Sequence, residues 1–271
     1  MSNKYWAQRV ANSQNKLTNK NIKDTEKQLI KYYLRTMESV ISSFESTYEK
    51  LLNTVEQGRM PTPADLYKMD KYWQLQAQLR RELQRLGEKQ AVLLSKNFEA
   101  QFFDIYNSFA LRGIEAYSTL DTAAARQMLN SIWCADGKNW SQRIWTNTDK
   151  LQQALNDSLI DCVTSGKKTT QLKNLLQSQF GVSYNRADTL VRTEMAHIQT
   201  QAAAQRYKDY GIKEVEVFVD EDERTCPICA KHEGERHKVN EVMPVPFHPR
   251  CRCCMVPVVD TGADAIKNNC E

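Results

Sequence analysis

The chain has 271 residues, of which 41% are hydrophobic and 26% are charged, and its formal net charge at pH 7 is +4. This length and composition indicate a soluble globular protein with room for two domains. No apolar run approaches the roughly 18 residues of a membrane span, which excludes an integral helical membrane protein, and so mild a net charge does not by itself indicate a nucleic-acid partner.

The first residues, from Met1 to Arg9, contain no basic segment followed by an apolar one, so no secretory signal is predicted. We therefore expect the protein to be made and kept in a reducing cytosol, where clustered cysteines favour metal over disulfides. Cys134 and Cys162 stand alone and are expected to be small buried residues, whereas Cys270 is expected to be exposed.

Long amphipathic helices are predicted for the first part of the chain. Apolar residues repeat at helical spacing from Ile22 to Val55, which predicts one helix from about residue 20 to residue 57, ended by Gly58. Thr62 before Pro63, with Asp65 three residues after it, predicts the start of a second helix. Apolar periodicity in that helix runs to Leu86, pauses at Gly87 and resumes from Leu94 to Phe109.

We expect residues 1–125 to form an extended long-helix arm or bundle that packs on another component; a plain helical bundle without a partner is the alternative. Residues 1–113 carry 18 Lys and Arg against 12 Asp and Glu, a net charge of +6, while the remainder carries 19 against 21, or −2. The basic half fits contact with DNA or an acidic partner, and a solvated helix surface explains the same charges.

Tryptophans at positions 133, 140 and 145 surround the turn signal Asp136-Gly137. They can stack a base or a carbohydrate, but an apolar floor joining two subdomains is the favoured interpretation. Three helices are then predicted, over about 148–164, 169–179 and 183–209, the last with Ser183 as N-cap and Gly211 at its C-terminal end. Strands are predicted at 214–219 and 255–259, the second confined to a sheet edge by Pro257.

Cysteine and histidine gather between residues 226 and 254. Cys226 and Cys229 form one zinc half-site, and His248 and Cys251 form a second at the same spacing. Cys253 is the alternate ligand and Cys254 a further spare thiol, while disulfides or unrelated buried thiols are the competing interpretation. Because about 50 residues, 211–260, are too few for a self-sufficient core, a structural Zn²⁺ with four protein ligands is predicted to stabilise this segment.

Other polar residues of this region are interpreted as structural. His232 and His237 lie in a polar loop and are expected at the surface, and the acidic run 220–223 fits a solvated turn better than a catalytic divalent-ion site. Arg192 and Glu194 fall on different faces of a helix, and each is expected to tie that helix to the strand or to the zinc loop through a buried ion pair.

Several motifs, in their order and spacing, resemble one known family. They are residues 136–145, Arg192-Thr193-Glu194, residues 222–229, Gly234 and residues 248–253. Together they resemble the minor head, or head morphogenesis, proteins of tailed bacteriophages typified by the F protein of phage Mu. The resemblance covers roughly residues 130–258 and makes Arg192, Glu194, Asp222 and Arg224 structural motif residues.

The resemblance implies a virion component, made in the bacterial host cytoplasm and not an enzyme, located in the phage head interior or at the portal vertex. The implied partners are the portal protein, a major capsid or scaffolding protein and viral DNA, with roles in head morphogenesis and in genome packaging or delivery. The expected fold is mainly α: a long-helix bundle, then a Mu F-like domain over residues 126–271 with a small zinc-stapled β-element. A zinc-stapled DNA-binding protein or nuclease is the alternative, with His197, His232 and His237 as weak candidates for a nuclease base.

Overall fold

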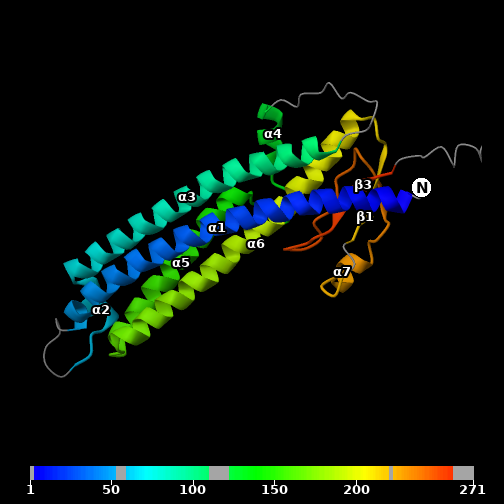
Figure 1. Ribbon diagram of the computed structural model, residues 1–271. Helices are drawn as coiled ribbons and strands as arrows, with labels where there is room; N and C mark the ends of the chain where they lie inside the picture. The colour runs from blue at the N-terminus through cyan, green and yellow to red at the C-terminus, as the bar shows by residue number, and fades with distance from the viewer. Residues whose placement is uncertain (1–2, 53–58, 110–121, 220–221, 259–271) are drawn as a thin grey trace, which may run out of the picture. The chain divides into compact units, whose positions relative to one another are not determined.

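The computed structural model describes residues 3–52, 59–109, 122–219 and 222–258. These residues form seven helices and one three-stranded sheet near the C-terminus (Figure 1). The predicted fold class, mainly α with a small C-terminal β-element, is confirmed. The helices are α1 (Asn3–Leu52), α2 (Pro63–Tyr67), α3 (Asp70–Ser108), α4 (Thr122–Leu129), α5 (Trp140–Thr164), α6 (Thr169–Asp209) and α7 (Pro227–Ala230). The strands are β1 (Glu214–Phe218), β2 (Arg236–Lys238) and β3 (Cys254–Pro257).

Two compact units share the chain. The first contains residues 1–25, 95–132 and 189–271, and the second contains residues 26–94 and 133–188. The units therefore alternate along the sequence and do not coincide with the consecutive segments 1–125 and 126–271. Whether those two segments are separable domains stays a prediction.

Helix α1 begins much earlier than predicted. Ala7, Ala11, Gln14 and Thr18 are buried at helical spacing, but alanine and polar residues carry little apolar signal in a sequence. The predicted end near residue 57 lies outside the described residues. The capping box before α2 is confirmed, since Asp65 N donates to Thr62 Oγ1 and Thr62 N donates to the Asp65 carboxylate.

Helices α3 and α6 are each longer than the sequence suggested. Helix α3 continues through Gly87, where an added Cβ would lie 2.6 Å from the Trp145 ring, so the glycine permits close helix packing rather than a pause. Helix α6 continues through Gly181, so the prediction of two helices was wrong. Ser183 is no cap: it is buried, and Tyr33 and Asn147 donate to its carbonyl.

Two further helix ends follow cap chemistry. Helix α5 begins at Trp140 rather than near residue 148, because the side chain of Asn139 caps it and that of Gln142 completes the capping box. The C-terminal signal of α6 is confirmed, since Gly211 has φ +72 and follows the helix end by two residues. Of the lone cysteines, Cys162 is buried as expected, Cys134 is half-buried, and Cys270 lies outside the described residues.

The sheet has the strand order β2-β1-β3, and both pairs are antiparallel. Strand β3 lies at an edge, as Pro257 predicted, whereas β2 was not predicted because its three residues are all polar. In the same unit, Ala7 and Ala11 of α1 belong to a buried cluster with Phe218, Cys254 and Val256 of β1 and β3. The start of α1 thus covers this sheet (Figure 1).

Candidate metal centre

The first half-site is a short helical turn. Cys226 is the N-cap of α7, with extended backbone angles, and Pro227 holds the first helical position. The backbone N–H of Cys229 donates to the Cys226 sulfur over 3.4 Å. This turn places both thiols on one side and gives Cys226 a polar neighbour that favours its thiolate.

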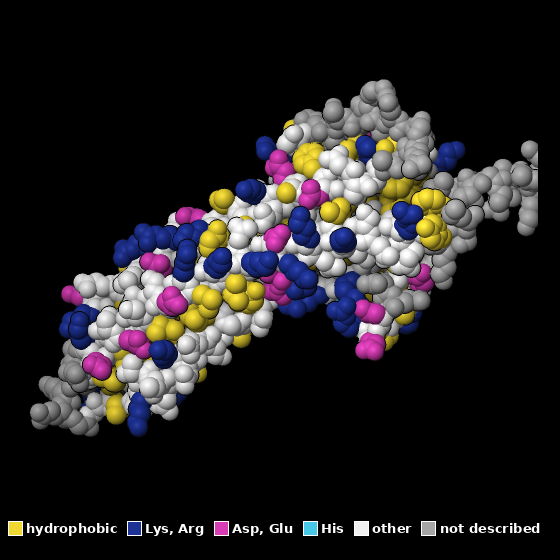
Figure 2. All heavy atoms as spheres, viewed as in Figure 1, with side chains coloured by type: hydrophobic (Ala, Val, Ile, Leu, Met, Phe, Trp, Pro, Cys, Tyr) yellow, Lys and Arg dark blue, Asp and Glu magenta, His cyan; other side chains and the backbone are white. Residues whose placement is uncertain are grey.

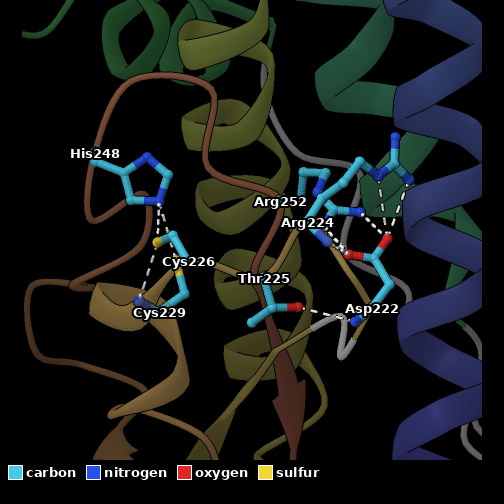
Figure 3. Close-up of polar contacts among 7 residues, drawn as sticks. All are labelled: Asp222, Arg224, Thr225, Cys226, Cys229, His248 and Arg252. Carbon is cyan, nitrogen blue, oxygen red and sulfur yellow. Dashed lines mark hydrogen bonds and ion pairs between the residues drawn. The ribbon is translucent and has the colours of Figure 1, made fainter.

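The second half-site meets the first directly. Nε2 of His248 lies 3.2 Å from Sγ of Cys226 and 3.1 Å from Sγ of Cys229, and Sγ of Cys229 lies 3.7 Å from Sγ of Cys251. Figure 3 shows the His248 ring directed at Cys226 and Cys229 from the opposite loop. Around a tetrahedral Zn²⁺, sulfur–sulfur separations are about 3.8 Å and sulfur–nitrogen separations about 3.6 Å. Cys226, Cys229 and His248 are therefore close enough to share one small cation, with the nitrogen slightly closer to both sulfurs than a bound ion would hold it, whereas Cys251 is grouped with Cys229 and Cys253.

The tautomer of His248 suits this arrangement. Its Nδ1 lies 2.8 Å from the carbonyl oxygen of Pro249 and is the donor in that contact. Nε2 is then left as the acceptor that a metal ion requires.

The protonation of the thiols depends on burial and on their mutual hydrogen bonds. A hydrogen bond from the Cys253 thiol lowers the pKa of Cys251 to about 5, and backbone N–H of Cys229 lowers the pKa of Cys226. Burial raises the pKa of the Cys229 thiol to about 12. The hydrogen bond between Cys253 and Cys251 raises the pKa of the Cys253 thiol. Without a cation the cluster holds a mixture of thiols and thiolates, which a bound divalent ion would shift towards thiolates.

Five side chains of the cluster are possible metal donors. The cluster contains two overlapping groups, one of Cys226, Cys229 and His248 and one of Cys229, Cys251 and Cys253. The structure thus places three of the predicted ligands, Cys226, Cys229 and His248, in one group and Cys251 with Cys229 and the alternate Cys253 in the other, and the choice among them stays a prediction. Cys254 is different, because it is fully buried in the apolar cluster under the sheet.

Asp222 braces the loop that precedes Cys226. Its carboxylate accepts hydrogen bonds from Arg252 over 2.7 Å and from Arg224 over 3.1 Å (Figure 3). The Arg252 guanidinium holds the pKa of the Asp222 carboxyl well below its usual range. The predicted structural motif residues Asp222 and Arg224 therefore meet at this loop, while residues 220–221 lie outside the described part of the chain.

Two threonines fasten the second half-site to α6. The backbone N–H of Arg250 donates to Oγ1 of Thr193 over 3.1 Å, and its Nε donates to Oγ1 of Thr189 over 3.0 Å. Arg250 has φ +63, which L-residues seldom adopt, so these contacts hold the turn before Cys251 in place. Sequence reasoning included Thr193 in the motif Arg192-Thr193-Glu194 without giving it a role and missed Thr189, because nothing marks such hydroxyls in a helix. Glu194 is buried and Arg192 half-buried on the same helix, and the ion pairs predicted for them stay predictions.

The remaining histidines have other surroundings. Burial lowers the pKa of His197 to about 4, and only 8% of this residue is exposed. His232 stacks on Phe247 with ring centroids 4.1 Å apart and bonds to Glu235, and His237 also pairs with Glu235. Both loop histidines are half-buried rather than fully at the surface.

Residues 153–256 match the family model described as Phage Mu protein F like protein. The match covers α6, the sheet as far as residue 256 and the whole cysteine and histidine cluster. It confirms the family resemblance over these residues, while the motif at residues 136–145 lies outside it. Comparison with curated proteins and with solved structures finds no significant match. Among the described residues, every helix is too short or too polar to cross a membrane.

Proposed function

We propose that the protein, whose residues 153–256 match the model of the Phage Mu protein F like family, is a minor head protein of a tailed bacteriophage. In this proposal it is a virion component, present in few copies at the portal vertex or in the head interior. Its role is structural, in head morphogenesis and in genome packaging or delivery. The observation that carries the proposal is the family match, which ends on the folded Cys/His cluster.

The metal in this proposal is a structural zinc ion held by Cys226, Cys229, His248 and Cys251, with Cys253 as the alternate. Four protein ligands occupy all positions of a tetrahedral coordination sphere and leave none for a reactive water. The ion therefore stabilises the fold and takes part in no reaction. When bound, zinc would supply the stability that the small sheet and its loops lack. The residues around it act by orienting donors: Pro249 fixes the His248 tautomer, and Thr193 fixes the Arg250 turn.

The proposed partners are the portal protein, a major capsid or scaffolding protein and viral DNA. Exposed lysines support an acidic partner: Lys16, Lys20 and Lys23 lie on one face of α1 within the first unit. Lys and Arg side chains recur along the face drawn in Figure 2. If DNA is that partner, binding to a random-sequence duplex should weaken steeply with added salt.

The proposed function is tested in the virion. Mass spectrometry of purified particles should detect the chain in far fewer copies than the major capsid protein, and immunogold labelling should place it at a single vertex. A nonsense mutation in its gene should give heads that fail in assembly or infection. Absence of the chain from purified particles that are fully infectious would contradict the proposal.

A further inference from the structure

Within the second unit, a polar groove runs between α3 and α5. The groove is open to solvent, its volume is about 550 Å³, and its walls come from both helices. This volume lies within the range of about 300–1,000 Å³ typical of ligand sites. The groove lies in a different part of the chain from the metal donors, which belong to the first unit.

Contacts between the two helices fix the length of the groove. At one end, Oδ1 of Asn156 accepts hydrogen bonds from Tyr72 Oη and Gln76 Nε2, both over 2.8 Å. At the other end, Gly87 lies directly against the Trp145 ring. The helices are therefore antiparallel. Each contributes a segment of equal length between these contacts, residues 76–87 of α3 and residues 145–156 of α5. At about 1.5 Å per residue the groove is roughly 16 Å long, the span of about five residues of extended polypeptide.

The walls carry side-chain amides rather than apolar groups. Five amides line the groove: Gln76, Gln84, Gln152, Gln153 and Asn156. Gln76 already donates to Asn156 and Gln84 to Glu88, so these amides offer only their remaining donors and acceptors. Donors and acceptors together are the complement of a peptide group. A docked helix would satisfy its own peptide groups and would need an apolar wall, and among the large apolar side chains only Trp145 lines the groove.

One charge of each sign lies in the groove, Arg80 on α3 and Asp149 on α5. Asp149 opposes a polyanion, so the groove does not suit a nucleic-acid backbone. A polar segment without a strong net charge meets both residues favourably.

We propose that the α3–α5 groove binds an extended, polar polypeptide segment of about five residues from another component of the phage head. Side-chain amides of the groove pair with the peptide groups of the segment, and Trp145 covers its end. The assignment of the partner as a head component rests on the proposed function, whereas the binding of a peptide does not.

The test uses the full-length chain, loaded with zinc, and a displayed library of random dodecapeptides. Selection on the wild type, with counter-selection on the double variant Gln84→Leu/Gln152→Leu, should enrich polar peptides that bind with 1:1 stoichiometry. Each single variant should weaken an enriched peptide about tenfold, the effect of losing one or two well-placed hydrogen bonds. Gln177→Leu, an exposed amide of α6 in the same unit, is the matched control and should leave affinity unchanged.

Thermal unfolding of each variant shows whether the groove still folds. Failure to enrich peptides on the wild type over the double variant would overturn the proposal, as would equal binding by wild type and both single variants. Preferential binding of a single-stranded oligonucleotide or an oligosaccharide at the groove would also overturn it. Because the library contains no phage sequence, absence of the chain from virions would leave a positive result standing and would remove only the identity of the partner.

Discussion

The guanidinium of Arg252 donates hydrogen bonds to both carboxylate oxygens of Asp222, one of them over 2.7 Å. Asp222 precedes the first pair of metal donors, and Arg252 lies between Cys251 and Cys253. The contact therefore joins the two segments that must meet if one ion is to be bound. It holds them together through side chains that are not themselves donors to the ion.

Loss of this contact should loosen the first half-site. In Asp222→Asn, amide hydrogens of residues 222–230 should exchange about two- to fivefold faster at pH 7, the scale of an exposed ion pair. Hydrogen exchange with mass spectrometry measures this change, and Glu223→Gln, at the neighbouring exposed carboxylate, is the control. Equal exchange in the two variants would contradict a bracing role for Asp222.

The pH dependence of the same contact has a definite sign. Arg252 lowers the folded-state pKa of Asp222, so the stabilisation is present above the usual carboxyl pKa of about 4 and is lost as pH falls through the folded value. The difference in exchange between wild type and Asp222→Asn should therefore persist from pH 7 down through pH 4 and shrink only below that range. Equal exchange in wild type and Asp222→Asn at pH 7, where the carboxyl is ionised, would show that Arg252 does not lower the Asp222 pKa.

Two helical glycines should respond oppositely to alanine. Gly87→Ala would place a methyl group 2.6 Å from the Trp145 ring, so we expect a loss of about 1–3 kcal/mol despite the better helix propensity of alanine. Gly181 has nothing within 4 Å of an added Cβ, so Gly181→Ala should stabilise by up to about 1 kcal/mol. Thermal or urea unfolding compares the two. Stabilisation by both substitutions would refute the close approach of α5 at Gly87.

Substitutions of the adjacent Cys253 and Cys254 should affect metal affinity and folding stability differently. Cys254→Ser would place a hydroxyl in the apolar cluster beneath the sheet and cost about 1–3 kcal/mol, with the metal content of the folded protein unchanged. Cys253→Ser should instead alter metal affinity if Cys253 is a ligand, and leave it nearly unchanged if Cys251 completes the set. Metal titration of both purified variants distinguishes these outcomes. Metal loss from folded Cys254→Ser would contradict its placement outside the cluster.

Local chemistry in the sequence predicted some features correctly, because their causes are local. The capping box of Thr62 and Asp65, the helix end at Gly211 and the spacing of Cys226 and Cys229 depend on neighbouring residues alone. Gly87 and Gly181 misled the prediction, since a glycine that permits helix packing, or is merely tolerated, looks like a breaker until the opposing surface is known. The start of α1 was missed because Ala7 and Ala11 gain their importance from the sheet they cover.

The candidate site divides in the same way. The candidate metal donors could be predicted from their spacing in the sequence. The hydrogen bonds of Arg250 to Thr193 and Thr189 could not, because these threonines precede Arg250 by 57 and 61 positions and no local pattern reports so distant a contact. Cys254 could not be separated from Cys253 by sequence, because the distinction depends on where β3 begins: Cys254 is its first residue and joins the apolar cluster with Val256, whereas Cys253 precedes the strand.

The most direct test of the central claim is the metal content of the full-length chain purified without added zinc. Elemental mass spectrometry should find one zinc ion per chain in the wild type and in Cys134→Ser, a control outside the cluster. Cys226→Ser and His248→Ala should lose the ion, and the C-terminal segment should unfold in both. A wild-type chain that is fully folded without metal, with these thiols free or oxidised, would contradict the zinc-stapled account.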